Sequence, residues 1–137
     1  MLRFLRLQNW KSYYEPVEFT MVATRERQHG DRLARVGRSR VLPITAIYGA
    51  NAAGKSALVD GLEALSGIVL ESRRAGAMLP LAPHLPEGKD EPTVFAVEIV
   101  VSAVGADDDA ADRVFYYELA ADRRRVHREL LAQVKAR

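Results

Sequence analysis

A short glycine-rich stretch constrains this chain more than any other feature. Residues 49–56 read Gly-Ala-Asn-Ala-Ala-Gly-Lys-Ser, which is a glycine, four residues and then Gly-Lys-Ser. The preceding run, 41–48, is rich in apolar and branched residues and predicts a buried strand. Apolar residues then recur at helical spacing and predict an amphipathic helix over about 54–71. The apolar positions of that helix are Ala57, Leu58, Gly61, Leu62, Leu65, Val69 and Leu70.

A strand, a glycine-rich turn and a helix in this order form the P-loop pattern. The glycines let successive backbone N–H groups turn towards one point, where the positive end of the helix also favours an anion. We expect Lys55 to reach the β- and γ-phosphates as the catalytic cation and the Ser56 hydroxyl to bind Mg²⁺. The predicted nucleotide-binding residues are Gly49, Ala50, Asn51, Ala52, Ala53, Gly54, Lys55 and Ser56. The alternative is a structural strand-to-helix turn with a solvated lysine, although a chance match is expected only roughly once in 200 chains.

Alternating apolar residues predict two groups of strands on either side of this unit. Residues 1–23 contain two such runs separated by polar turn formers, and they predict an antiparallel hairpin. Residues 93–101 alternate with apolar side chains on nearly both faces, which indicates a strand inside a sheet. Two further runs, at 113–119 and from 126 onwards, predict returning antiparallel strands within 93–134.

The connecting segments are polar, basic or rich in proline. Residues 24–40 carry six arginines against Glu26 and Asp31, and they predict either a solvated basic loop or a loop that contacts DNA or RNA phosphates. Residues 73–92 contain four prolines and predict a surface loop. The acidic run 106–112 predicts a solvated hairpin tip, because it lacks the glycine and distal glutamate of a calcium loop.

Length and composition bound the class of protein. The chain has 137 residues, a formal net charge of +2 and no cysteine. It is long enough for a single domain with its own core. The absence of cysteine, of a signal peptide and of any membrane-spanning apolar run predicts a soluble cytoplasmic protein with no membrane partner.

Three segments together resemble the N-terminal part of an ABC/SMC-type P-loop ATPase. Residues 8–13, Gln-Asn-Trp-Lys-Ser-Tyr, resemble the Asn-Phe-(Arg/Lys)-Ser-aromatic signature of SMC-like heads. Residues 42–56 resemble the P-loop of bacterial AAA-family ATPases related to recombination-repair and abortive-infection ATPases, with Ala53 where serine is usual. The strands after residue 92 resemble the antiparallel β-layer of those proteins.

The resemblance implies a fold, ligands and partners. The implied fold is α/β, a partial P-loop NTPase core of strand, P-loop and helix (41–72) with an antiparallel β-layer, similar to an ABC/SMC head. The implied ligands are ATP and Mg²⁺, bound by residues 49–56, with Lys11 as a further phosphate contact or, equally, an exposed turn lysine. The implied partners are a second copy in an ATP-dependent dimer or a C-terminal half of the ATPase.

Two motifs of that family are not found in the sequence. ATP hydrolysis in the family needs an apolar strand ending in Asp-Glu and a Leu-Ser-Gly-Gly signature. Leu65-Ser66-Gly67 imitates the signature, but it lies inside the helix that follows the P-loop. We therefore interpret 1–137 as a single, incomplete ATP-binding domain, either truncated or one half of a split system, for which nucleotide binding is better supported than turnover.

Two other functions stay open. One is a non-enzymatic module, either a DNA- or RNA-associated protein that uses the arginines of residues 25–40 or a degenerate ATPase remnant. The other is a kinase that phosphorylates a small molecule, which the antiparallel strands after the helix make the least favoured.

Overall fold

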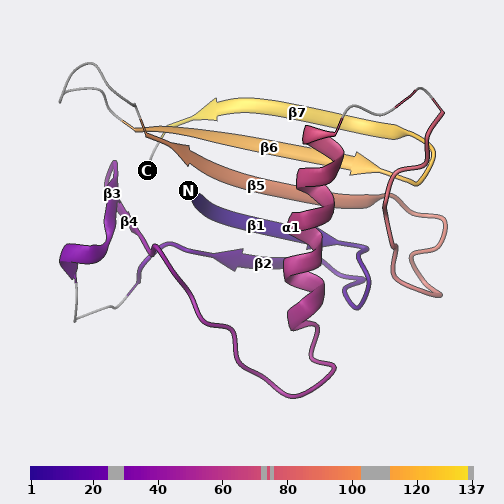
Figure 1. Cartoon of the computed structure of the whole chain (residues 1–137), viewed down its shortest axis with the longest axis horizontal. Coiled ribbons are helices and arrows are strands. Elements are labelled where there is room, and N and C mark those ends of the chain that lie inside the picture. The colour runs from indigo at the N-terminus through magenta and orange to yellow at the C-terminus, as the bar shows by residue number, and fades with distance from the viewer. Residues whose placement is uncertain (25–29, 72–73, 75, 103–111, 136–137) are drawn as a thin grey trace.

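The computed structural model describes residues 1–24, 30–71, 74, 76–102 and 112–135. Within them, five strands form one antiparallel sheet in the order β2-β1-β5-β6-β7 (Figure 1). The strands are β1 (Leu2–Gln8), β2 (Val17–Thr20), β5 (Thr93–Val101), β6 (Arg113–Ala121) and β7 (Val126–Val134). The predicted opening hairpin is confirmed by the pairing of β1 with β2, and the predicted strands within 93–134 are confirmed by β5, β6 and β7.

The register of the sheet separates a core face from an outer face. Leu7 of β1 lies opposite Phe95 of β5, and Phe95 lies opposite Leu119 of β6. Because side chains alternate along a strand, these three fully buried residues share one face. Arg6, one position away from Leu7, belongs to the other face. The prediction that 93–101 is an internal strand is confirmed, since β5 lies between β1 and β6.

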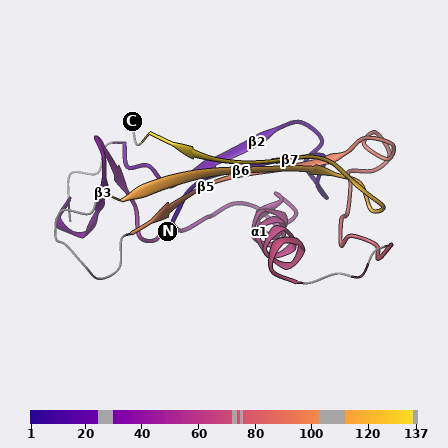
Figure 2. The ribbon, with the colours of Figure 1, turned by 90° about the horizontal axis from the view of Figure 1, so that it is seen from above.

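One helix covers the core face. The helix α1 (Lys55–Leu70) crosses the strands on one side of the sheet, as the edge-on view of Figure 2 shows. Its buried residues are Ala57, Leu58, Gly61 and Leu65, all of which belong to the predicted apolar stripe. The helix begins and ends within one residue of the predicted bounds. Burying this stripe against Leu5, Leu7 and Phe95 of the sheet forms the main core.

The predicted basic loop contains regular structure. Residues Gly30–Arg32 form a short 3-10 helix, and β3 (Ala34–Val36) pairs with β4 (Ser39–Val41) in a small antiparallel hairpin. Val36 and Val41 are fully buried against Val100 and Val114 of the large sheet. The sequence did not indicate this hairpin, because arginines lie between its two buried valines. Residues 25–29 of the predicted loop and residues 106–111 of the predicted acidic tip lie outside the described residues.

The strand predicted before the glycine-rich turn does not form. Only Val41 of the run 41–48 belongs to a strand, and residues 42–50 have neither helix nor strand. Ile44 is 81% exposed and Tyr48 is 90% exposed. An apolar run forms a buried strand only where neighbouring strands accept its backbone hydrogen bonds, and the described chain places no strand beside it. Figure 1 shows this segment running from the β3–β4 hairpin to the start of α1, away from the sheet.

The architecture is therefore α+β and not the predicted α/β. The described residues form an antiparallel sheet covered by a single α-helix, without a strand leading into the glycine-rich loop. The predicted loop over 73–92 is confirmed where it is described, because residues 76–92 contain no helix or strand. No helix among the described residues is long and apolar enough to cross a membrane.

Candidate phosphate-binding site

Residues 49–56 form a curled, largely exposed loop that leads into α1. The backbone turns at Asn51 and Ala52, and the Ala53 N–H donates to the Ala50 carbonyl at 3.3 Å. Ala52 has a φ of 63° and Gly54 a φ of 85°, so two residues adopt the left-handed conformation within four positions. That conformation is easy for glycine and costs an alanine about 1 kcal/mol. The loop therefore adopts a defined backbone conformation and is not an irregular linker.

The side chain of Lys55 folds back over this loop. Its Nζ donates to the Gly49 carbonyl at 2.7 Å and to the Ala50 carbonyl at 2.5 Å. The ammonium group thus lies at the first residues of the loop, although Lys55 itself is the first residue of α1. These contacts bring together the two ends of the predicted phosphate site, Gly49 and Lys55, without any help from a preceding strand.

The N-terminus of α1 is open to an anion. Gly54 is the N-cap residue, no side chain caps the helix, and its first turn contains no acidic residue. The first N–H groups of a helix have no partner inside the helix and carry the positive end of its dipole. Ser56 is exposed in the same turn, where its hydroxyl is accessible to a metal ion.

The turn between β1 and β2 lies directly against this helix terminus. The Tyr13 hydroxyl donates to the Gly54 carbonyl at 2.9 Å, and the Trp10 indole N–H donates to the Ala57 carbonyl at 2.8 Å. Trp10 is 2% exposed and meets the Phe95 ring edge to face, with ring centroids 5.2 Å apart. The resemblance singled out residues 8–13, but sequence reasoning missed the roles of Trp10 and Tyr13, because nothing in the sequence places them on α1.

The same turn is anchored on its other side by a buried asparagine. The Asn9 side-chain amide donates to the carbonyls of Gly88 and Glu91, both at 2.8 Å, and its Oδ1 accepts the His84 N–H at 2.9 Å. The Thr93 hydroxyl donates to the Asn9 carbonyl at 2.8 Å. Asn9 is 1% exposed, so these bonds satisfy a polar group that burial would otherwise penalise.

Lys11 points to α1 and not to the glycine-rich loop. Its ammonium group forms an ion pair with the Asp60 carboxylate, and the two side chains are 40% and 38% exposed. Asp60 lies about one turn beyond Ser56 along the helix, so Lys11 is near the candidate site but already has a partner. The Lys11 ammonium group therefore lies about one helical turn beyond residues 49–56, and its contact with phosphate stays a prediction.

The described arginines of the predicted nucleic-acid surface lie on the β3–β4 hairpin and on the 3-10 helix before it. Arg35 and Arg40 are directly opposite each other in the register, and both are exposed. Like charges opposite each other destabilise a strand pair, so this pair is not explained by the stability of the hairpin. Arg32 and Arg38 are exposed on the same small unit, while Arg25 and Arg27 lie outside the described residues.

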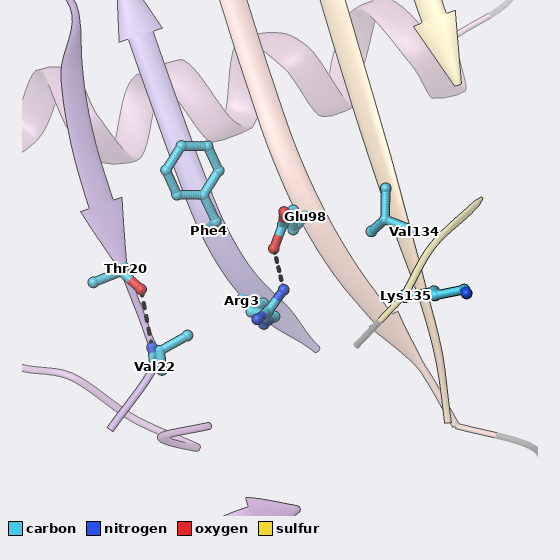
Figure 3. Close-up of a pocket in the computed structure, with 7 residues that line it drawn as sticks. All are labelled: Arg3, Phe4, Thr20, Val22, Glu98, Val134 and Lys135. Atoms are coloured by element: carbon cyan, nitrogen blue, oxygen red, sulfur yellow. Dashed lines mark hydrogen bonds and ion pairs between the residues drawn. The ribbon is translucent and has the colours of Figure 1, made fainter. Parts of the chain in front are cut away.

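A separate cavity lies on the sheet face opposite α1. Figure 3 shows Arg3, Phe4, Thr20 and Glu98 among the residues that line it, and the Arg3 guanidinium donates to the Glu98 carboxylate at 2.5 Å. None of the predicted site residues lines this cavity. Glu98 is the only acidic residue among the described residues that line this cavity, and Arg3 neutralises its charge. The cavity therefore contributes no residue to the glycine-rich site.

No protein-family model, curated protein or solved structure matches this chain.

Proposed function

We propose that this protein binds the triphosphate of Mg-ATP with residues 49–56, as the N-terminal part of an ABC/SMC-like P-loop ATPase. The observation that supports this most directly is the position of the Lys55 ammonium group, which lies on the Gly49 and Ala50 carbonyls across a tightly curled loop. A phosphate that enters the loop offers the ammonium a charged acceptor in place of two neutral carbonyls. The ammonium–carbonyl bonds have a charge on the donor only, whereas an ammonium–phosphate contact pairs two opposite charges, so the Coulombic attraction favours the bound state.

The open terminus of α1 supports the same proposal. With no capping side chain and no acid in the first turn, the helix amides are available to phosphate oxygens and Ser56 to Mg²⁺. Phosphoryl transfer also needs a group that orients the attacking water. We propose that an apolar strand ending in Asp-Glu, and the signature motif, come from a further polypeptide segment, and that this chain binds nucleotide without turning it over.

The exposed run 42–48 favours such a further segment. A P-loop holds its shape best when a paired strand leads into it, and here Ile44 and Tyr48 are instead almost fully exposed. Contiguous exposed apolar surface is typical of sites that another polypeptide covers, and Ile47 adds a third exposed apolar side chain to the same run. The partner we propose is a polypeptide with an extended apolar strand that pairs with 42–48, either in an ATP-dependent dimer or as the second half of the ATPase.

Calorimetric titration of the chain with Mg-ATP tests the binding proposal. We expect saturable binding at one site, lost or weakened at least tenfold in Lys55→Ala, which removes the cation from the loop. Lys89→Ala is the matched control, because Lys89 is exposed in the loop over 76–92. Binding that is absent in the parent chain, or equally strong in Lys55→Ala, would contradict the proposal.

The opposed arginines favour a second candidate function, binding to a nucleic-acid backbone. Arg35 and Arg40 keep a repulsive arrangement that a polyanion would neutralise. The test is the affinity for a mixed-sequence DNA duplex of about 20 base pairs as a function of salt. We expect Arg35→Ser with Arg40→Ser to weaken binding and to flatten the salt dependence. No binding of the parent chain at low salt would exclude this function.

A further inference from the structure

The position of the glycine-rich loop must be fixed from the helix side. In the run 42–48 the described residues form no strand pairing, and the run is mostly exposed, so it cannot hold the loop in place. The contacts that reach the first turns of α1 come instead from the turn between β1 and β2. That turn is the one that carries the Gln-Asn-Trp-Lys-Ser-Tyr motif of residues 8–13.

We infer that Tyr13 is a positioning residue for nucleotide binding, which acts by holding the Gly54 carbonyl and, with Trp10, the first turn of α1. This inference rests on the proposed function of residues 49–56. Tyr13 does not touch the phosphates in this account. Its hydroxyl fixes the backbone at the point where the loop becomes helix, and so it sets the direction of the amides that would receive the phosphate.

The contact at Gly54 is specific to a tyrosine facing a glycine. A Cβ added at Gly54 would lie 2.7 Å from the Tyr13 hydroxyl oxygen and 3.0 Å from Ser12 Oγ. Gly54 also has a φ of 85°, a conformation that disfavours other residues. Two separate features therefore favour glycine at position 54. One is the positive φ of its backbone, and the other is the close approach of the Tyr13 side chain.

Trp10 makes the second contact of this pair. Its indole N–H reaches the Ala57 carbonyl, one turn further along α1, while its ring is buried against Phe95 of β5. Two hydrogen bonds to carbonyls three residues apart fix both the position of the helix terminus and the rotation of its first turn. Asn9 fixes the base of the same turn, because its amide donates to the loop over 76–92 and its carbonyl accepts the hydroxyl of Thr93 in β5.

A loop that is already held in its binding shape loses less conformational entropy when the ligand arrives. Without the Tyr13 hydroxyl, the ordering of Gly54 must occur during binding and weakens it. A neutral hydrogen bond contributes a modest net amount, so we expect Tyr13→Phe to raise the Kd for Mg-ATP roughly 3- to 10-fold. The ring remains, and with it the packing of the turn.

Tyr14→Phe is the matched control. The Tyr14 hydroxyl donates to the exposed Glu91 carboxylate at 3.0 Å, and Glu91 lies in the segment before β5 and not on α1. Both variants remove one phenolic hydroxyl from neighbouring residues of the same turn. We expect the Kd of Tyr14→Phe to equal that of the parent chain, so a difference between the two variants isolates the contact to Gly54.

The experiment has two readouts on the full chain, Mg-ATP affinity by calorimetry and amide hydrogen exchange without nucleotide. The inference predicts weaker binding and faster exchange at the first turn of α1 in Tyr13→Phe only, measured well below the midpoint of unfolding. A residue that only stabilised the fold would lower the unfolding temperature without changing the Kd. A parent chain that binds no Mg-ATP overturns the proposed function and this inference with it. A parent chain that binds, together with an unchanged Kd or unchanged exchange in Tyr13→Phe, overturns the inference alone.

Discussion

Two glycines of α1 have opposite surroundings, and their substitution by alanine tests the packing of the helix on the sheet. A Cβ at Gly61 would lie 2.9 Å from Leu7 Cδ2 and 3.3 Å from the Trp10 indole nitrogen. Among the residues that the structure describes, a Cβ at Gly67 would meet only the Glu71 side chain just beyond the helix, at 3.6 Å. The helix therefore approaches β1 closely at Gly61 and not at Gly67.

The expected effects follow from two competing terms. Replacing glycine by alanine inside a helix stabilises it by about 1 kcal/mol. At Gly67 no other term opposes this gain, so Gly67→Ala should raise the free energy of unfolding by about 1 kcal/mol. At Gly61 the new methyl group would contact the side chain of Leu7. Because Leu7 is fully buried, its side chain cannot move aside into solvent. Overpacking costs about 1–3 kcal/mol, which leaves Gly61→Ala about 1 kcal/mol less stable than the parent chain.

Urea unfolding followed by the fluorescence of Trp10, the single tryptophan, measures both variants. We expect the midpoints to move in opposite directions at an unchanged slope, with a difference of about 2 kcal/mol between the variants. Equal stabilisation by both alanines would show that α1 does not approach β1 at Gly61, and it would refute the packing described above.

Three further predictions concern the turns and the sheet. Asn9→Ala leaves the Gly88 and Glu91 carbonyls without their donor, and we expect a loss of about 3 kcal/mol in the free energy of unfolding, measured in urea. Burial and the hydrogen bond to Glu129 raise the pKa of Tyr117 from 10.0 to about 12. The folded state therefore retains this proton, and the corresponding stability is present below pH 10 and lost as pH rises towards 12, a component that Tyr117→Phe should remove from a series of unfolding curves. Hydrogen bonds from the Arg124 backbone N–H and the His127 ring lower the pKa of the Asp122 carboxyl from 3.8 to about 2, and NMR titration should show His127→Ala moving it part of the way back.

Local patterns predicted the elements that bury one regular face. The stripe of α1 and the alternation of β5 repeat over nine residues or more, and each has a partner within the chain. The run 41–48 carried an equally good apolar pattern and did not form a strand. A strand also needs neighbours for its backbone, and that requirement is a property of the whole sheet and not of the run itself.

Some features of the candidate site also follow from local sequence patterns, and others depend on residues far apart in the sequence. The glycine-rich loop, the position of Lys55 and the start of α1 follow from spacing alone. The contacts of Tyr13 and Trp10 join residues that are about forty positions apart, and no periodicity or local motif predicts such a pairing. For Lys11 the resemblance left a phosphate contact and an exposed turn lysine equally open, and neither alternative foresaw the ion pair with the Asp60 carboxylate.

The proposed function requires that the backbone amides of residues 51–56 bind the triphosphate of Mg-ATP. Amide NMR spectra of the chain, recorded during a titration with Mg-ATP, test this directly at the level of single residues. We expect saturable shifts of the amide signals that are concentrated on 51–56 and the first turn of α1, and we expect their loss in Lys55→Ala. Spectra in which these amides do not move at saturating Mg-ATP, or in which the shifts fall on the β3–β4 hairpin instead, would contradict it.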